Sequence, residues 1–222
     1  MPQKKPILSV TDLSISFGKN TVIHNISYQL NQNEILGIVG ESGSGKSVSS
    51  LAILGLLPPK ISKINSGNII YAENDLTKIT SKAFRSIRGK KIAIIFQEPM
   101  SSLNPSMICG KQVKEILLEH TNLSKARAKE ETLALFENVK LPDIHRVYNA
   151  YPHEISGGQK QRVMIAMAIA CKPDILIADE PTTALDVTVQ KDIILLLKEL
   201  QVKTGMSILF ITHDLALISE IA

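Results

Sequence analysis

The sequence predicts an α/β fold, a mostly parallel sheet with an N-terminal antiparallel β part and an inserted all-helical part. Three observations predict it. Short apolar runs, typical of strands buried on both faces, alternate with helical patterns along the chain. The first 30 residues instead alternate apolar and polar side chains around short turns. From about residue 98 to residue 160 the strand signals vanish and helical periodicity replaces them.

The N-terminal elements are predicted as antiparallel strands joined by a turn at 18–20. The apolar residues that alternate with polar ones there are Leu13, Ile15, Phe17, Val22, Ile26 and Tyr28. The run 35–39 indicates a buried strand, and a helix is predicted over Lys46–Leu57 because Pro58 would stop it. Further strands are expected at 67–71 and 92–96.

The inserted part is predicted to contain amphipathic helices. One face carries Val113, Ile116 and Leu117, and another carries Leu133, Phe136 and Val139. After it we expect a helix at 163–170, a strand at 175–178, a helix with a leucine-rich stripe around 193–200, a strand at 207–211 and a final helix from residue 215. That helix shows no stop signal, so we expect a C-terminally truncated chain.

This pattern divides the single domain, 1–222, into three parts. Residues 1–33 and about 64–75 are assigned to the antiparallel β part, 34–97 and 161–222 to the parallel core, and about 98–160 to the helical part.

Composition excludes several classes of protein. The 222 residues carry 25 Lys and Arg against 21 Asp and Glu, a net charge of +4, and 44% are hydrophobic, which is typical of a folded domain. With 5 Phe, 4 Tyr and no Trp, an aromatic platform for single-stranded nucleic acid is disfavoured. Two isolated cysteines are too few for a zinc or disulfide framework.

A basic cluster, which we expect to form a solvated face, comprises Arg85, Arg88, Lys90 and Lys91.

Residues 40–47, Gly-Glu-Ser-Gly-Ser-Gly-Lys-Ser, match the phosphate-loop pattern G-x-x-x-x-G-K-[ST]. Glycines allow the backbone to wrap a phosphate, and the following helix adds its positive N-terminal end. Lys46 is predicted to reach the β- and γ-phosphates, and Ser47 to bind Mg²⁺. A chance Gly/Ser-rich turn is the alternative. The predicted contacts of the nucleotide phosphates are Gly40, Ser42, Gly43, Ser44, Gly45, Lys46 and Ser47.

Two acids, Asp179 and Glu180, follow the apolar run 175–178. A buried strand that ends on an acid is the usual way to deliver a carboxylate to the Mg²⁺ shell of a P-loop NTPase, the role predicted for Asp179. Glu180 is then placed to accept a proton from an attacking water. Such a pair alone more often caps a helix or lies in a solvated turn, but beside a phosphate loop the catalytic interpretation is favoured.

A second candidate anion site is formed by Ser156, Gly157, Gly158 and Gln159, which open the next predicted helix. One nucleotide does not need two phosphate cradles in one subunit. We therefore infer that this segment serves a nucleotide held by another subunit. A plain Gly-Gly loop is the alternative.

The combination resembles the ATP-binding-cassette (ABC) ATPases. Residues 155–159, Ile-Ser-Gly-Gly-Gln, are similar to their LSGGQ signature, with Ile in place of Leu. The resemblance implies that Gln97 is the Q-loop glutamine, that Asp186 ends the D-loop at 184–186, and that His213 is the switch histidine. It also implies that Phe17 stacks on adenine, where Tyr is commoner. Each of these four residues taken singly is more typical of a surface or packing role.

The match looks closest to the ATPases of bacterial peptide and nickel importers. The segments that carry it are Gln97–Met100, Ser101–Pro105, Tyr151–Glu154 and Ala178–Gln190. Those relatives normally continue well past the switch histidine.

The resemblance implies two such domains paired head to tail, as a homodimer or heterodimer, with ATP and Mg²⁺ between the phosphate loop of one and Ser156–Gln159 of the other. Ser47, Gln97 and Asp179 would hold the metal, while Lys46, Glu180 and His213 would act in hydrolysis. It further implies transmembrane permease subunits as partners, a solute-binding protein as an indirect one, and no nucleic acid. The chain would lie peripherally on the cytoplasmic face of the inner membrane and energise import of peptides or a related small solute.

Two other functions share the phosphate loop. A soluble ABC-type ATPase acting on nucleic acid or in translation would tend to carry long coiled-coil insertions, zinc cysteines or strongly basic linkers, which this sequence lacks. A small-molecule kinase would leave Ser156–Gln159 and His213 unexplained.

Overall fold

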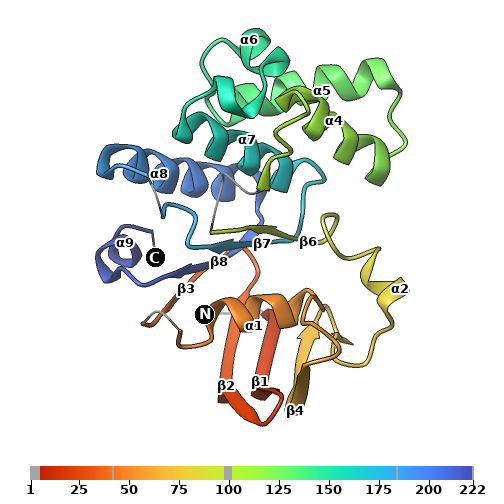
Figure 1. The fold of residues 1–222 in the computed structure, drawn as a ribbon, viewed down its shortest axis with the longest axis vertical. Helices are drawn as coiled ribbons and strands as arrows, with labels where there is room; N and C mark the ends of the chain where they lie inside the picture. The colour runs from red at the N-terminus through yellow and green to blue at the C-terminus, as the bar shows by residue number, and fades with distance from the viewer. Residues whose placement is uncertain (1–5, 42, 98–101, 184, 222) are drawn as a thin grey trace.

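The computed structural model describes residues 6–41, 43–97, 102–183 and 185–221, and it contains two four-stranded sheets (Figure 1). The first has the strand order β2-β1-β4-β5 and is antiparallel. Its strands are β1 (Pro6–Phe17), β2 (Asn20–Asn31), β4 (Ser62–Tyr71) and β5 (Asn74–Asp75). The strand β4 begins five residues before the predicted 67, because its polar N-terminal half pairs with β1, for example Ile64 with Ile15.

The second sheet is parallel and has the order β3-β8-β7-β6. Its strands are β3 (Ile35–Val39), β6 (Ile92–Ile95), β7 (Ile175–Asp179) and β8 (Ser207–Thr212). Parallel strands carry their carboxyl ends to one edge, so the segments that follow β3, β6, β7 and β8 meet there. All residues of β7 and β8 are buried, as expected for strands covered on both faces.

Helices cover both faces of the parallel sheet. On one face α1 (Lys46–Ile53) packs with the antiparallel sheet against Ile175, Ile177, Leu209 and Ile211. On the other face α7 (Gly157–Ile169) and α8 (Val187–Thr204) pack against Leu176, Ala178, Ile208 and Phe210. The two hydrophobic clusters therefore use alternate residues of the same strands, and α1 and α7 lie on opposite faces.

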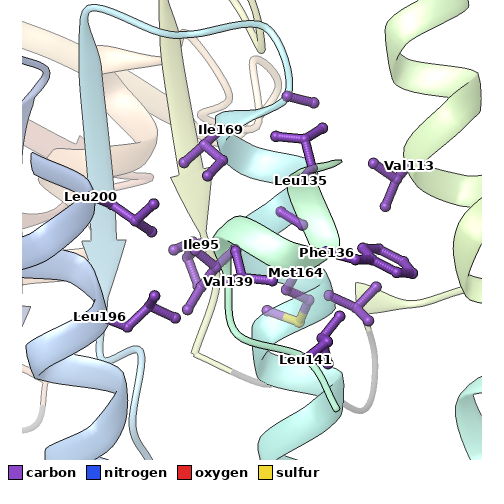
Figure 2. Close-up of a cluster of buried hydrophobic side chains, with 14 of the residues drawn as sticks. Ile95, Val113, Leu135, Phe136, Val139, Leu141, Met164, Ile169, Leu196 and Leu200 are labelled. Atoms are coloured by element: carbon purple, nitrogen blue, oxygen red, sulfur yellow. The ribbon is translucent and has the colours of Figure 1, made fainter. Parts of the chain in front are cut away.

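The inserted part is helical, as predicted. Its elements are α4 (Cys109–His120), α5 (Lys125–Asn138), α6 (Ile144–Asn149), the short 3₁₀ helix η1 (Pro152–Glu154) and the start of α7. Figure 2 shows its core, in which Phe136 of α5 lies beside Val113 of α4 and Met164 of α7. The ring of Phe136 packs on Tyr148 with centroids 6.4 Å apart. The other helices in the described part of the chain are α2 (Ser81–Phe84) and α9 (Leu215–Ile221).

The prediction that the first helix reaches Leu57 is wrong, because α1 ends at Ile53. Gly55 has φ 59°, its N–H donates to the carbonyl of Ala52, and the N–H of Leu56 donates to the carbonyl of Leu51. This is a Schellman termination, in which a glycine in the left-handed conformation ends the helix. Gly55, not Pro58, is the stop signal.

The prediction that the basic cluster forms a solvated face is wrong for Arg88. Its guanidinium donates from Nε to the carbonyl of Leu54 and from Nη2 to that of Gly55, each at 2.6 Å. It also lies 4.8 Å from the ring centre of Phe84. Arg88 therefore closes the exposed carbonyl end of α1, whereas Arg85 is exposed as predicted.

In the described parts of the chain, no helix combines the length and the apolarity needed to cross a bilayer.

Candidate nucleotide site

The phosphate loop joins the carboxyl end of β3 to the start of α1. Gly43 and Gly45 have φ 82° and 91°, conformations that favour glycine. A Cβ at Gly45 would lie 3.1 Å from Cγ1 of Ile23, so the loop also packs closely on β2. Among the residues that the structure describes, no side chain caps the N-terminus of α1, which leaves its first N–H groups for an anion.

Lys46 points back into this loop. It is only 9% exposed, and its Nζ donates to the carbonyls of Gly40 at 2.5 Å and Glu41 at 2.7 Å. An ammonium has three donors, so one remains for a phosphate oxygen.

Asp179 ends β7 next to α1 and is 5% exposed. Its Oδ2 accepts a hydrogen bond from Ser50 Oγ at 3.3 Å, while its Oδ1 is buried and has no hydrogen-bond partner among the described residues. Burial raises the pKa of Asp179, and the neighbouring hydroxyls of Ser47 and Ser50 oppose that shift. A buried carboxylate oxygen that lacks a partner fits the first shell of a hard cation such as Mg²⁺. The predicted ligands Ser47 and Asp179 therefore lie together and fit the metal.

The side chain of Glu180, which follows β7, contacts residues that follow β6 and β8. Its Oε2 accepts a hydrogen bond from Gln97 Nε2 at 3.0 Å and lies 3.2 Å from Nδ1 of His213. Gln97 follows β6, and His213 follows β8. The carboxylate is 11% exposed and the imidazole 59% exposed, so the cluster opens to solvent on the histidine side. The structure thus brings together the three predicted residues Gln97, Glu180 and His213.

Sequence reasoning missed three polar residues of this region. Thr183 Oγ1 donates to the same Oε2 of Glu180 at 3.0 Å. Gln190 Nε2 donates to the carbonyls of Thr182 at 3.3 Å and Leu185 at 3.1 Å, and so braces the loop from α8. Ser50 contacts Asp179. Thr183 and Gln190 lie in the segment 178–190 that carries the family resemblance, but nothing in the spacing of these hydroxyl and amide side chains, or of Ser50, predicts their contacts in the site.

The predicted signature segment begins α7. Ser156 is the N-cap, its Oγ accepts from the N–H of Gln159 at 3.3 Å, and Gln159 Oε1 accepts from the N–H of Ser156 at 3.0 Å. This reciprocal pair is a capping box. A Cβ at Gly158 would lie 2.9 Å from Cγ1 of Val189, and one at Gly157 would lie 3.6 Å from Leu185. Gly158 therefore allows α7 to pack closely on the start of α8.

Asp186 is the N-cap of α8 and accepts from the N–H of Val189 at 3.0 Å. Among the described residues, no hydrogen bond or ion pair joins 156–159 or Asp186 to the phosphate loop. The predicted signature and phosphate loop are thus not brought together within one chain.

A cavity of about 590 Å³ lies behind the phosphate loop. Its lining includes Val22, His24, Tyr28, Lys46 and Ser49. Burial raises the pKa of Tyr28 to about 12. Phe17, predicted to stack on adenine, is half-buried against the antiparallel sheet and does not line this cavity, so its role stays a prediction.

Ser42 of the phosphate loop and Ala184 of the D-loop segment lie outside the described residues, as do residues 98–101.

Comparisons with known proteins identify the family of the chain. The family described as ABC transporter matches residues 23–183. The dipeptide transport ATP-binding protein DppD of Haemophilus influenzae is 52% identical over 97% of this chain and 66% of its own length. The oligopeptide transport ATP-binding protein OppD of Bacillus subtilis is 48% identical over 97% of this chain and 62% of its own. The chain therefore spans slightly less than two thirds of these curated relatives.

Solved structures show the same fold. The dimeric ATP-binding cassette MJ0796, in a post-hydrolysis state bound to ADP and Pi, superposes with a TM-score of 0.81, 29% identity and coverage of 95% of this chain and 89% of that one. The cbiO1 protein from Clostridium perfringens, part of the ABC transporter complex cbiONQ, gives 0.83 at 25% identity, covering 99% and 83%. These matches confirm the predicted fold class and the resemblance to the ATP-binding proteins of peptide transport: the chain belongs to the ABC transporter family.

Proposed function

We propose that this chain binds and hydrolyses ATP with Mg²⁺ and thereby energises a transporter, most simply an importer of peptides. The observation that carries the proposal is the convergence of Gln97, Glu180 and His213 at the strand ends beside the buried Asp179 and the phosphate loop. The names of the peptide-transport relatives support the cargo class.

Phosphoryl transfer requires mainly positioning and charge stabilisation. Mg²⁺ held by Ser47, Asp179 and Gln97 would neutralise phosphate charge. Gln97 uses Nε2 for Glu180, which leaves its Oε1 for the metal, and His213 uses Nδ1, which leaves Nε2 for the γ-phosphate. Lys46, which is held in place by carbonyls of the phosphate loop, would neutralise the negative charge that develops on the γ-phosphate. Glu180 accepts the proton of the attacking water.

The proposed active unit is a head-to-tail dimer of two ABC ATPase domains, either identical or different. The phosphate loop of one domain and Ser156–Gln159 of the other would enclose each nucleotide. The opposite placement of α1 and α7 on the parallel sheet supports this arrangement, as does the dimeric state of the MJ0796 cassette. In such a dimer Asp186 would lie near the shared site.

We propose that the helical insertion contacts transmembrane permease subunits and passes them the movement of Gln97. An apolar groove of about 310 Å³ beside β6 supports this, since its lining includes Ile94, Phe96, Ile116 and Met167. Phe96 is exposed although it directly precedes Gln97. The chain would then sit peripherally on the cytoplasmic face of the membrane, with a solute-binding protein as an indirect partner. None of the relatives reported above is named for nucleic acid, so that alternative gains no support.

The proposal is tested with Glu180→Gln. The amide keeps the shape of the side chain but cannot accept the proton, so we expect ATP binding to persist while turnover falls about 10²- to 10⁴-fold. Binding is measured by calorimetry and turnover by phosphate release at high protein concentration. Glu137→Gln, an exposed change on α5, is the matched control and is expected to leave both unchanged. Unimpaired turnover in Glu180→Gln would exclude Glu180 as the base.

A further inference from the structure

The carboxylate of Glu180 is held asymmetrically. Among the described residues, the side-chain contacts from Gln97, Thr183 and His213 all go to Oε2, at 3.0, 3.0 and 3.2 Å. An oxygen that accepts several hydrogen bonds is stabilised as the charged acceptor and becomes a poor base. The other oxygen, Oε1, is therefore the better proton acceptor of the two.

Thr183 differs from the other two contacts because it belongs to the same turn as Glu180. The N–H of Thr183 donates to the carbonyl of Glu180 at 3.2 Å, which closes a β-turn with Pro181 at its second position. Gln190 fixes the next residues of this loop from α8. Gln97 and His213, in contrast, follow the separate strands β6 and β8. Gln97 is proposed to bind the metal, and His213 the γ-phosphate.

We infer that Thr183 is a positioning residue, whose hydroxyl holds Oε2 of Glu180 so that Oε1 faces the attacking water. This inference rests on the proposed function. As the water oxygen bonds to the γ-phosphorus, its proton passes to Oε1 and the bond from the γ-phosphorus to the bridging oxygen breaks, which releases ADP and phosphate. Thr183 touches none of these atoms and acts only through the orientation of Glu180.

The test compares Thr183→Val, which keeps the branched shape without the hydroxyl, with Thr183→Ser, which keeps the hydroxyl. We expect Thr183→Val to lower kcat about 10- to 100-fold, the scale of a misoriented catalytic group, with unchanged KM, calorimetric ATP affinity and Tm. Thr183→Ser should restore kcat to near the wild-type rate. Thr183→Ala serves as a second hydroxyl-free variant if the valine variant fails to fold, and should show the same loss.

A double-mutant cycle separates positioning from a general structural effect. If Thr183 acts only through Glu180, Thr183→Val added to Glu180→Gln should cause no further loss of kcat. Additive losses, a wild-type kcat in Thr183→Val, or a serine variant as slow as the valine variant would each overturn the inference. A wild-type chain that hydrolyses no ATP would instead overturn the proposed function itself.

Discussion

At the residue scale, the two acids at the end of β7 are held at a cost to stability. Glu180 has φ 47°, a left-handed conformation that costs a non-glycine residue about 1–2 kcal/mol. Asp179 has a buried oxygen that no described residue contacts by a hydrogen bond. A backbone hydrogen bond to the neighbouring strand β8 holds Glu180 in this conformation, since its N–H donates to the carbonyl of Ile211 at 2.9 Å. A left-handed acid beside an acid with a buried, unpartnered oxygen is a combination of costs that functional sites bear.

Arg88 allows a stability prediction at the same scale. Its replacement by Leu removes two charged donors and leaves the carbonyls of Leu54 and Gly55 without them, so we expect the free energy of unfolding to fall by about 2–3 kcal/mol. Urea unfolding followed by circular dichroism measures this. The matched control is Arg85→Leu on the exposed side, expected to stay within about 0.5 kcal/mol of wild type. Equal effects of the two changes would mean that the hydrogen bonds of Arg88 contribute nothing.

At the scale of elements, substitution of two glycines distinguishes the energetic cost of backbone strain from that of a packing clash. Gly18 between β1 and β2 and Gly55 after α1 have nearly the same φ, 58° and 59°. A Cβ at Gly18 would meet nothing within 4 Å, whereas one at Gly55 would lie 2.4 Å from the ring of Phe84. Gly18→Ala should therefore cost about 1–2 kcal/mol from strain alone. Gly55→Ala should cost about 1–3 kcal/mol more, because the ring has to move. Urea unfolding of both variants checks the difference, and equal losses would exclude the packing contribution.

The same scale shows what the sequence could predict. The strands β3, β6, β7 and β8 were predictable because their apolar runs are short and bounded by polar residues. The prediction that 35–39 is a buried strand is wrong in its burial: β3 lies at the edge of the parallel sheet, so its residues are half-buried and Val39 is exposed. The first half of β4 was not, since its polar residues 62–66 form a strand only by pairing with β1. In the site, the phosphate loop and the strand-end acids follow from spacing. The contact of Thr183 with Glu180 does not, because it depends on a left-handed glutamate that no local pattern indicates.

At the scale of the whole molecule, the parallel sheet separates the phosphate loop from the segment Ser156–Gln159, the two proposed half-sites. The phosphate loop starts α1 on one face, and Ser156 caps α7 on the other. Each segment is held by hydrogen bonds of its own and does not need the other. Lys46 fixes the phosphate loop, and the capping box fixes the start of α7. A second copy related by twofold symmetry would present the missing half to each.

This arrangement predicts complementation between two inactive variants. Lys46→Ala damages the phosphate loop. Ser156→Asp keeps an N-cap oxygen but sets a negative charge against the phosphate. Each variant alone should hydrolyse almost no ATP. In an equal mixture half of the dimers are mixed and each holds one intact site, so activity should recover to about a quarter of the wild-type rate. Phosphate release from the mixture, compared with each variant alone at the same total concentration, measures the recovery. Thermal unfolding of each variant first establishes that both are folded. A mixture no faster than the mean of its components would mean that two copies of this chain do not share their nucleotide sites.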